Sequence, residues 1–195
     1  MCSDIWEQIF DYFEVVSLFT TFSSIIATTD QVLFNENNRY LLRGFTLSNK
    51  LTSLFRTIPL CRIISLTLYE TGDFEVIEHC SQLRLLKLIG QYEWITSIIR
   101  KVSRLNSKLT QLTITVPNIE SLSNLLRSIQ YLSSLRRLEI HTDCFVSDGK
   151  TCGFTSIPNE IEQIVLDSCF TTDFSDLFNS ITLYQLYAIT QYQFD

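Results

Sequence analysis

Leu83-Arg84-Leu85-Leu86-Lys87-Leu88 is one copy of a short phrase: an apolar residue, two variable residues, an apolar residue, one variable residue, an apolar residue. Copies also begin at residues 63, 109, 135 and 161, a weaker copy begins at 42, and a partial copy begins at 183. From 42 to 161 the successive starts are 21, 20, 26, 26 and 26 residues apart. Three equal intervals in a row indicate that the chain contains an internal repeat.

Each copy of the phrase predicts a β-strand. Its second and third apolar positions are two residues apart, and such positions share one face of an extended strand. The stretches between copies instead have helical spacing, as in Ile95, Ile98, Ile99, Val102 and Leu105 and in Ile119, Leu122, Leu125, Leu126 and Ile129. Asn118, which follows Pro117, is a candidate N-cap for the second of these helices. The sequence therefore predicts an α/β fold in which strands and helices alternate.

The phrase and its spacing resemble leucine-rich repeats, whose periods are about 20–29 residues. The resemblance implies a solenoid over residues 41–195, with about six strand–helix repeats and a curved parallel sheet. Ordering one repeat costs more free energy than its few apolar side chains regain, so neighbouring repeats are expected to fold together. The alternative is an ordinary α/β domain with regularly spaced strands. A longer loop is expected between Ile140 and Ile161, which enclose Gly149, Gly153 and Pro158, and no capping repeat is expected after the partial copy.

The variable residues of the strands are the candidate partner-binding surface, because strands line the concave face of such a solenoid. Aromatic residues, arginine and apolar residues that become buried dominate most protein interfaces. The candidate residues on this face are Tyr69, Leu85, Lys87, Ile89, Gln111, Arg137, Glu139 and His141. For Leu85 and Ile89 the alternative is that neighbouring side chains cover them.

The first forty residues lack the phrase and predict short helices. One apolar face combines Ile5, Ile9, Phe10 and Phe13, and a second combines Val15, Leu18, Phe19 and Phe22. A third helix is expected from about Asp30 to Tyr40. Three short, aromatic-rich helices bury little by themselves, so this segment is expected to pack on the repeats or on a partner.

Residues 4–13, DIWEQIFDYF, followed by Ser17-Leu18, resemble an F-box. The resemblance covers roughly residues 3–40, within a helical segment expected over residues 1–40. It implies docking on the Skp-type adaptor of a cullin–RING ubiquitin ligase, with the repeats holding a protein substrate. Carried over by position, the docking face would comprise Asp4, Ile5, Ile9, Phe10, Phe13 and Leu18. Cys2-Ser3 replaces the Leu-Pro that opens the family motif, and its late Trp is missing. Two alternatives therefore stay open: these helices cap the array, or the chain is a stand-alone binding module without a ligase connection.

Charge and hydropathy limit the other partner classes. A net charge of −6 argues against general affinity for nucleic acid, which needs a basic surface. Arg100, Lys101, Arg104 and Lys108 form a local basic cluster, which we interpret as the solvated face of a helix. No apolar run is long enough for a membrane span, and acids near the N-terminus argue against a signal peptide. The sequence therefore predicts a cytoplasmic or nuclear protein without a membrane partner.

Nothing in the sequence favours catalysis. The 6 cysteines are scattered without a CxxC pair, so neither a disulfide framework nor a metal site is expected, and no cofactor motif is present. We therefore expect a binding protein without a cofactor rather than an enzyme. The remote alternative is a thiol hydrolase that uses Cys144 as nucleophile and His141 as base.

Overall fold

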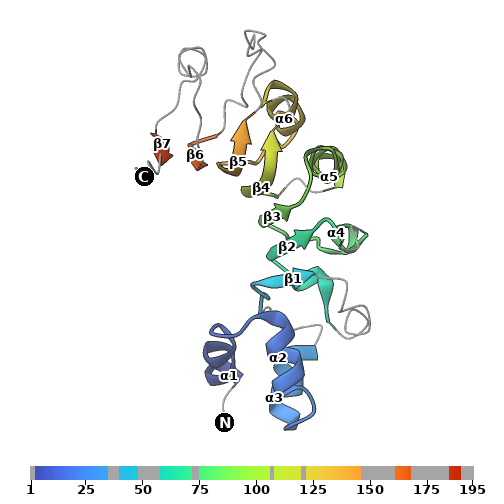
Figure 1. Cartoon of the computed structure of the whole chain (residues 1–195). Helices are drawn as coiled ribbons and strands as arrows, with labels where there is room; N and C mark the ends of the chain where they lie inside the picture. The colour runs from blue at the N-terminus through green and yellow to red at the C-terminus, as the bar shows by residue number, and fades with distance from the viewer. Residues whose placement is uncertain are drawn as a thin grey trace. The chain divides into compact units, whose positions relative to one another are not determined.

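The computed structural model describes residues 3–34, 40–47, 58–71, 75–105, 108–119, 122–145, 161–167 and 185–189 (Figure 1). The chain divides into two compact units, Met1–Arg84 and Leu85–Asp195. Both contain helices and parallel strands, which confirms the α/β class. In the described part of the chain, no helix has the length and apolar character needed to cross a bilayer.

The first unit begins with three helices, α1 (Ser3–Phe10), α2 (Val15–Phe22) and α3 (Ala27–Phe34). Their apolar faces form a small core whose members include Phe10, Val15, Leu18, Phe19, Val32 and Leu33. The first two helices are where the sequence pattern predicts them. The third begins at Ala27, whereas the sequence predicted a start near Asp30. Its buried residues are Thr29, Val32 and Leu33. Residues 35–39 of the predicted helix lie outside the described residues, and Tyr40, its predicted end, is not helical.

Two parallel strands follow in this unit, β1 (Phe45–Leu47) and β2 (Ser65–Tyr69). Phe45 lies opposite Leu66 and Leu47 opposite Leu68, so equivalent positions of two copies of the phrase pair with each other. All four side chains are buried. The short helices η2 (Leu60–Arg62) and α4 (Val76–His79) flank β2 in the chain.

Arg62 joins the helices of this unit to its strands. Its guanidinium donates hydrogen bonds to the carbonyl oxygens of Val32, Leu33 and Tyr40, at 3.1, 2.8 and 2.7 Å. Two of these acceptors are at the C-terminal end of α3, where carbonyl groups lack partners within the helix and a positive charge is favourable. Burial lowers the pKa of Arg62, but arginine keeps its charge in proteins.

The second unit contains five parallel strands in chain order. They are β3 (Leu85–Ile89), β4 (Gln111–Ile119), β5 (Arg137–Phe145), β6 (Gln163–Asp167) and β7 (Gln185–Ile189). Positions one sequence interval apart lie opposite each other, as in the row Leu86, Leu112, Leu138, Ile164 and Leu186. The strands predicted from the phrase are therefore confirmed, including one within the partial copy.

Helices α5 (Tyr92–Leu105) and α6 (Leu122–Ile129) lie on one side of these strands (Figure 1). Each buries the apolar stripe that its spacing predicts: Ile95, Ile98, Ile99 and Val102 of α5, and Leu125, Leu126 and Ile129 of α6. The phrase residues of β3, β4 and β5 are buried as well. The core of this unit therefore lies between the helices and one face of the sheet.

The N-cap predicted at Asn118 is wrong. Asn118 and Ile119 belong to β4, which continues beyond the phrase and pairs with β5 as far as Phe145. The strand is longer than predicted because Val116 and Ile119 are buried, and because Thr142 on β5 donates a hydrogen bond to the carbonyl oxygen of Pro117 at 3.2 Å. The longer loop expected before Ile161 falls largely on residues 146–160, which lie outside the described residues.

Candidate functional site

The face of β3, β4 and β5 away from α5 and α6 carries the variable residues of their phrases. Strand alternation and pairing arrange them in rows across β3, β4 and β5. One row is Leu85, Gln111 and Arg137, the next is Lys87, Thr113 and Glu139, and the third is Ile89, Thr115 and His141. Seven of the eight candidate partner-binding residues therefore lie on β3, β4 and β5. The eighth, Tyr69, ends β2 of the first unit and is exposed.

Glu139 is the centre of a polar cluster on this face. The Arg137 guanidinium contacts its Oε1 through two nitrogens, with Nε at 2.6 Å. Thr113 donates a hydrogen bond to Oε2 at 3.1 Å, and Nε2 of His141 lies 3.9 Å from the same oxygen. The Glu139 side chain is only 15% exposed, whereas that of Arg137 is 43% exposed. The carboxylate is therefore held within the sheet surface, and the arginine remains available to a partner.

The rest of the face combines charge with apolar surface. Lys87 is exposed, and Leu85, Ile89 and Gln111 are partly buried by their neighbours. The partial burial of Leu85 and Ile89 agrees with the alternative that neighbouring side chains cover them in part. A partner could therefore bury a small apolar area here and meet fixed polar groups beside it, as in many protein interfaces.

The expected docking residues of the helical segment do not all lie on the surface. Ile5 is 46% exposed, and Phe13 is also exposed, but Phe10 and Leu18 are each only 1% exposed. Phe10 packs against Trp6, Phe22 and Tyr40 with ring centroids 5.3–6.2 Å apart. Phe10 and Leu18 are therefore part of the core of the three helices and not of the surface that this fold exposes. Of Asp4 the structure describes only its place in α1.

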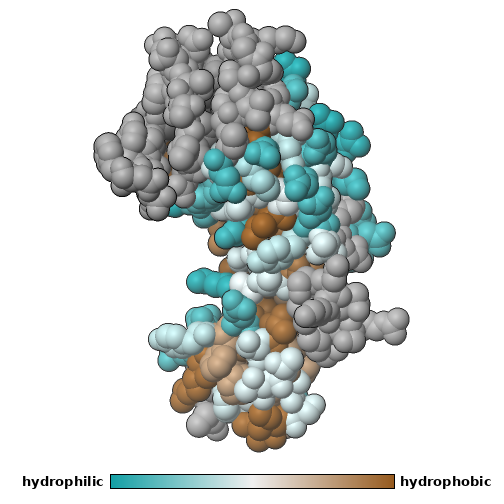
Figure 2. Space-filling model, viewed as in Figure 1, coloured by the Kyte–Doolittle hydropathy of each residue, from teal (hydrophilic) through white to brown (hydrophobic). Residues whose placement is uncertain are grey.

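The exposed members of the set surround a shallow pocket at the end of α1. It is lined by Ile5, Gln8, Ile9, Asp11, Tyr12 and Phe13. Tyr12 is 88% exposed, and Figure 2 shows further hydrophobic side chains on the surface of this helical region. This pocket is the part of the first unit that best fits a docking role, since large exposed apolar side chains often mark interaction sites.

The sequence candidates omitted two residues that matter here. Thr113 donates a hydrogen bond to Glu139. The repeat interval of 26 residues that separates them predicts that they lie opposite each other on neighbouring strands. Tyr12 lies within the F-box-like stretch but follows the end of α1, and no pattern in the sequence indicates its exposure.

The strand geometry of β5 argues against the thiol-hydrolase alternative. Residues 141 and 144 are both in this strand and are three positions apart. Positions separated by an odd number belong to opposite faces of a strand, which is unfavourable for a nucleophile and its base.

No family model, no curated protein and no solved structure matches the chain.

Proposed function

We propose that this chain is a protein-binding module built as a leucine-rich-repeat solenoid with an F-box-like helical segment at its N-terminus. In this proposal the segment docks on the Skp-type adaptor of a cullin–RING ubiquitin ligase. The exposed sheet face then holds a protein substrate, with Arg137 and the apolar pair Leu85 and Ile89 as its main contacts.

The in-register pairing of the phrase carries the repeat part of the proposal. Phe45 pairs with Leu66 at an interval of 21 residues, and Leu86, Leu112 and Leu138 pair at intervals of 26. A repeat array requires this agreement between sequence interval and strand register, because each unit buries its apolar residues against the next. A domain whose strands were merely evenly spaced would not need equivalent residues to lie opposite each other.

Three short helices and the exposed pocket near Tyr12 support the docking part. The helices α1, α2 and α3 all lie within the F-box-like segment, and Ile5, Tyr12 and Phe13 leave apolar surface exposed there. The second candidate function is a stand-alone binding module, and the replacement of the family's Leu-Pro by Cys2-Ser3 favours it.

An adaptor-binding measurement tests the proposal. The full chain is titrated with a purified Skp-type adaptor and compared with an Ile5→Asp/Tyr12→Asp variant. Both side chains are exposed, so charges there should leave the fold intact and weaken binding at least about tenfold by opposing burial of the docking surface. Phe10 is unsuitable for this test because its substitution would disrupt the core.

The matched control is Ile25→Asp/Ile26→Asp. These residues are also exposed, lie outside the expected docking set and change the charge equally. The control should bind like the unaltered chain, and circular dichroism should show that all three proteins are folded. If the folded, unaltered chain does not bind the adaptor, the ligase connection is wrong and the stand-alone module remains.

A further inference from the structure

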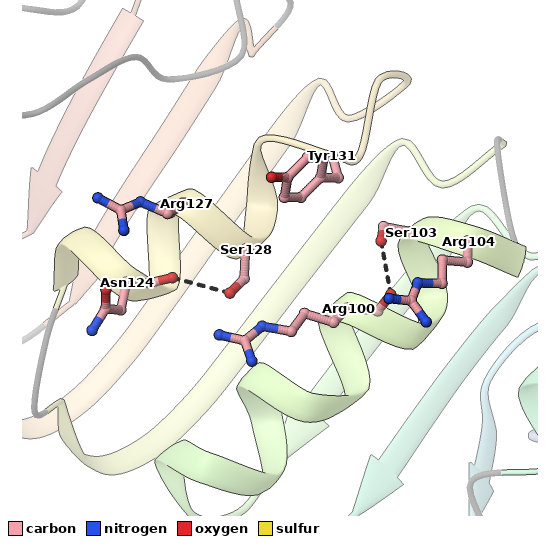
Figure 3. A pocket seen from close by; sticks show the side chains of 7 residues that line it. All are labelled: Arg100, Ser103, Arg104, Asn124, Arg127, Ser128 and Tyr131. Carbon is pink, nitrogen blue, oxygen red and sulfur yellow. Dashed lines mark hydrogen bonds between the residues drawn. The ribbon is translucent and has the colours of Figure 1, made fainter.

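Helices α5 and α6 line a pocket on the second unit that plays no part in the proposed function. Its lining residues are Arg100, Ser103, Arg104, Asn124, Arg127, Ser128 and Tyr131 (Figure 3). The lining includes three arginines and no acidic residue, although the whole chain has 21 acidic and 15 basic residues. The pocket is therefore a local concentration of positive charge on an acidic protein.

The spacing of these residues explains why they meet. Arg100, Ser103 and Arg104 are three and four positions apart, which places them on one face of α5. Asn124, Arg127 and Ser128 have the same spacing on α6, and Tyr131 follows the end of that helix. The apolar stripes of both helices are buried beneath, so the polar faces border the pocket from its two sides. The basic cluster noted in the sequence is thus completed by Arg127, from a different helix.

The guanidinium groups are the main donors that the pocket offers. Ser103 and Ser128 already donate their hydroxyl hydrogens to the carbonyl oxygens of Arg100 and Asn124, at 2.9 and 3.0 Å. Among the described residues, no Asp or Glu side chain forms an ion pair with Arg100, Arg104 or Arg127. Figure 3 shows Arg100 extending from α5 towards α6. An anion in the pocket would therefore meet positive charge that no described carboxylate neutralises.

We propose that this pocket binds a phosphate monoester, the compact dianion carried by phosphorylated side chains and small metabolites. Guanidinium groups match the geometry of phosphate oxygens and bind them in pairs of hydrogen bonds. A phosphate monoester carries a charge of about −1.5 to −2, so it suits a pocket lined by several arginines better than a carboxylate with a single charge does. A long polyanion is disfavoured, because nucleic acid binding needs many phosphate contacts and the rest of the chain is acidic. The site rests on α5 and α6 alone and does not depend on adaptor docking.

Arginine side-chain NMR resolves the site directly. The Nε–Hε signals of the full chain are followed during titration with inorganic phosphate at constant ionic strength. The signals of Arg100, Arg104 and Arg127 should shift to saturation, whereas that of exposed Arg43 should not. A serine phosphopeptide, compared with inorganic phosphate and with the unphosphorylated peptide, then distinguishes a protein-borne phosphate from a free one. Saturable binding of either phosphate source supports the site.

Charge-matched variants complete the test. Arg100→Gln/Arg127→Gln should weaken phosphate binding about tenfold or more, since it removes two charge-assisted contacts. Arg43→Gln/Arg84→Gln makes the same change in net charge at two exposed arginines outside the pocket and should leave phosphate binding unchanged. Arg100→Lys/Arg127→Lys keeps the charge and should lie between the two, which separates loss of charge from loss of paired hydrogen bonds. Equal shifts of all exposed arginines, or equal weakening in both glutamine variants, would overturn the proposal. So would an RNA oligonucleotide that binds the pocket far more tightly than phosphate.

Discussion

At the scale of single residues, we expect Arg62 to contribute more to the stability of the first unit than an exposed charged residue does. It is buried, and its three hydrogen bonds reach the end of α3 and the backbone of Tyr40. Replacing it would leave these carbonyl groups short of partners in a dry environment, which is more costly than losing an exposed ion pair.

Arg62→Met is therefore expected to lower the free energy of unfolding by about 2–4 kcal/mol. Chemical denaturation followed by circular dichroism measures this change. Arg43→Met is the matched control, because Arg43 is exposed, and it should change stability by less than about 0.5 kcal/mol. Equal effects of the two substitutions would show that the buried hydrogen bonds contribute nothing.

Cys80 gives the first unit a sensitivity to alkali. Burial raises the pKa of its thiol from 9.0 to about 12. Between these two pH values the Cys80 thiol is ionised in the unfolded chain and protonated in the folded chain. The contribution of this thiol to the free energy of unfolding is therefore present below pH 9 and is lost as pH rises. From pH 9 to pH 10 this group should remove about 1 kcal/mol of the free energy of unfolding.

Denaturation of the reduced protein at several pH values tests this sign. Cys80→Ala should show a shallower decline above pH 9, because it removes a thiol that ionises more readily in the unfolded chain than in the folded one. Identical slopes would mean that the Cys80 thiol is not protected from ionisation in the folded state.

At the scale of elements, alternation along β5 separates structural from binding residues. Leu138 is fully buried, whereas Arg137 beside it lies on the opposite face of the strand and its side chain is 43% exposed. Leu138→Ala should cost about 2–5 kcal/mol of stability, as large-to-small changes in cores do. Arg137→Ala should cost about 1 kcal/mol or less, since its ion pair is partly exposed. Thermal unfolding of the two variants compares them, and a reversed order would mean that the strand presents its faces the other way.

The phrase made the strands predictable because burial on one face of a strand imposes a period of two that the sequence displays directly. The extension of β4 through Asn118 was not predictable, because Ile119 fits both the helical spacing that follows and a buried strand position. The burial of Phe10 and Leu18 was not predictable either. An apolar helix face has the same sequence pattern whether it packs in the protein's own core or against a partner. Arg127 and Arg100 line the same pocket because α6 packs beside α5, and no local sequence pattern predicts this packing.

At the scale of the whole molecule, the net charge of −6 is distributed unevenly over the surfaces described. The sheet face is mixed, with Arg137 and Glu139 paired, whereas the pocket of α5 and α6 is basic. The two surfaces should therefore respond differently to salt, because an unpaired positive pocket loses attraction for anions as screening increases.

Stacking of the phrases in register is tested most directly by a cross-link between neighbouring strands. Gln111→Cys/Arg137→Cys places two thiols at directly paired positions, where the backbone separation suits a disulfide. Mild oxidation and peptide mass spectrometry should identify this bridge in high yield. Thr113→Cys/Arg137→Cys, offset by two residues on the same face, should remain largely unlinked because its Cα atoms are too far apart. A bridge that forms in the offset pair but not in the paired positions would contradict the register, and with it the repeat array.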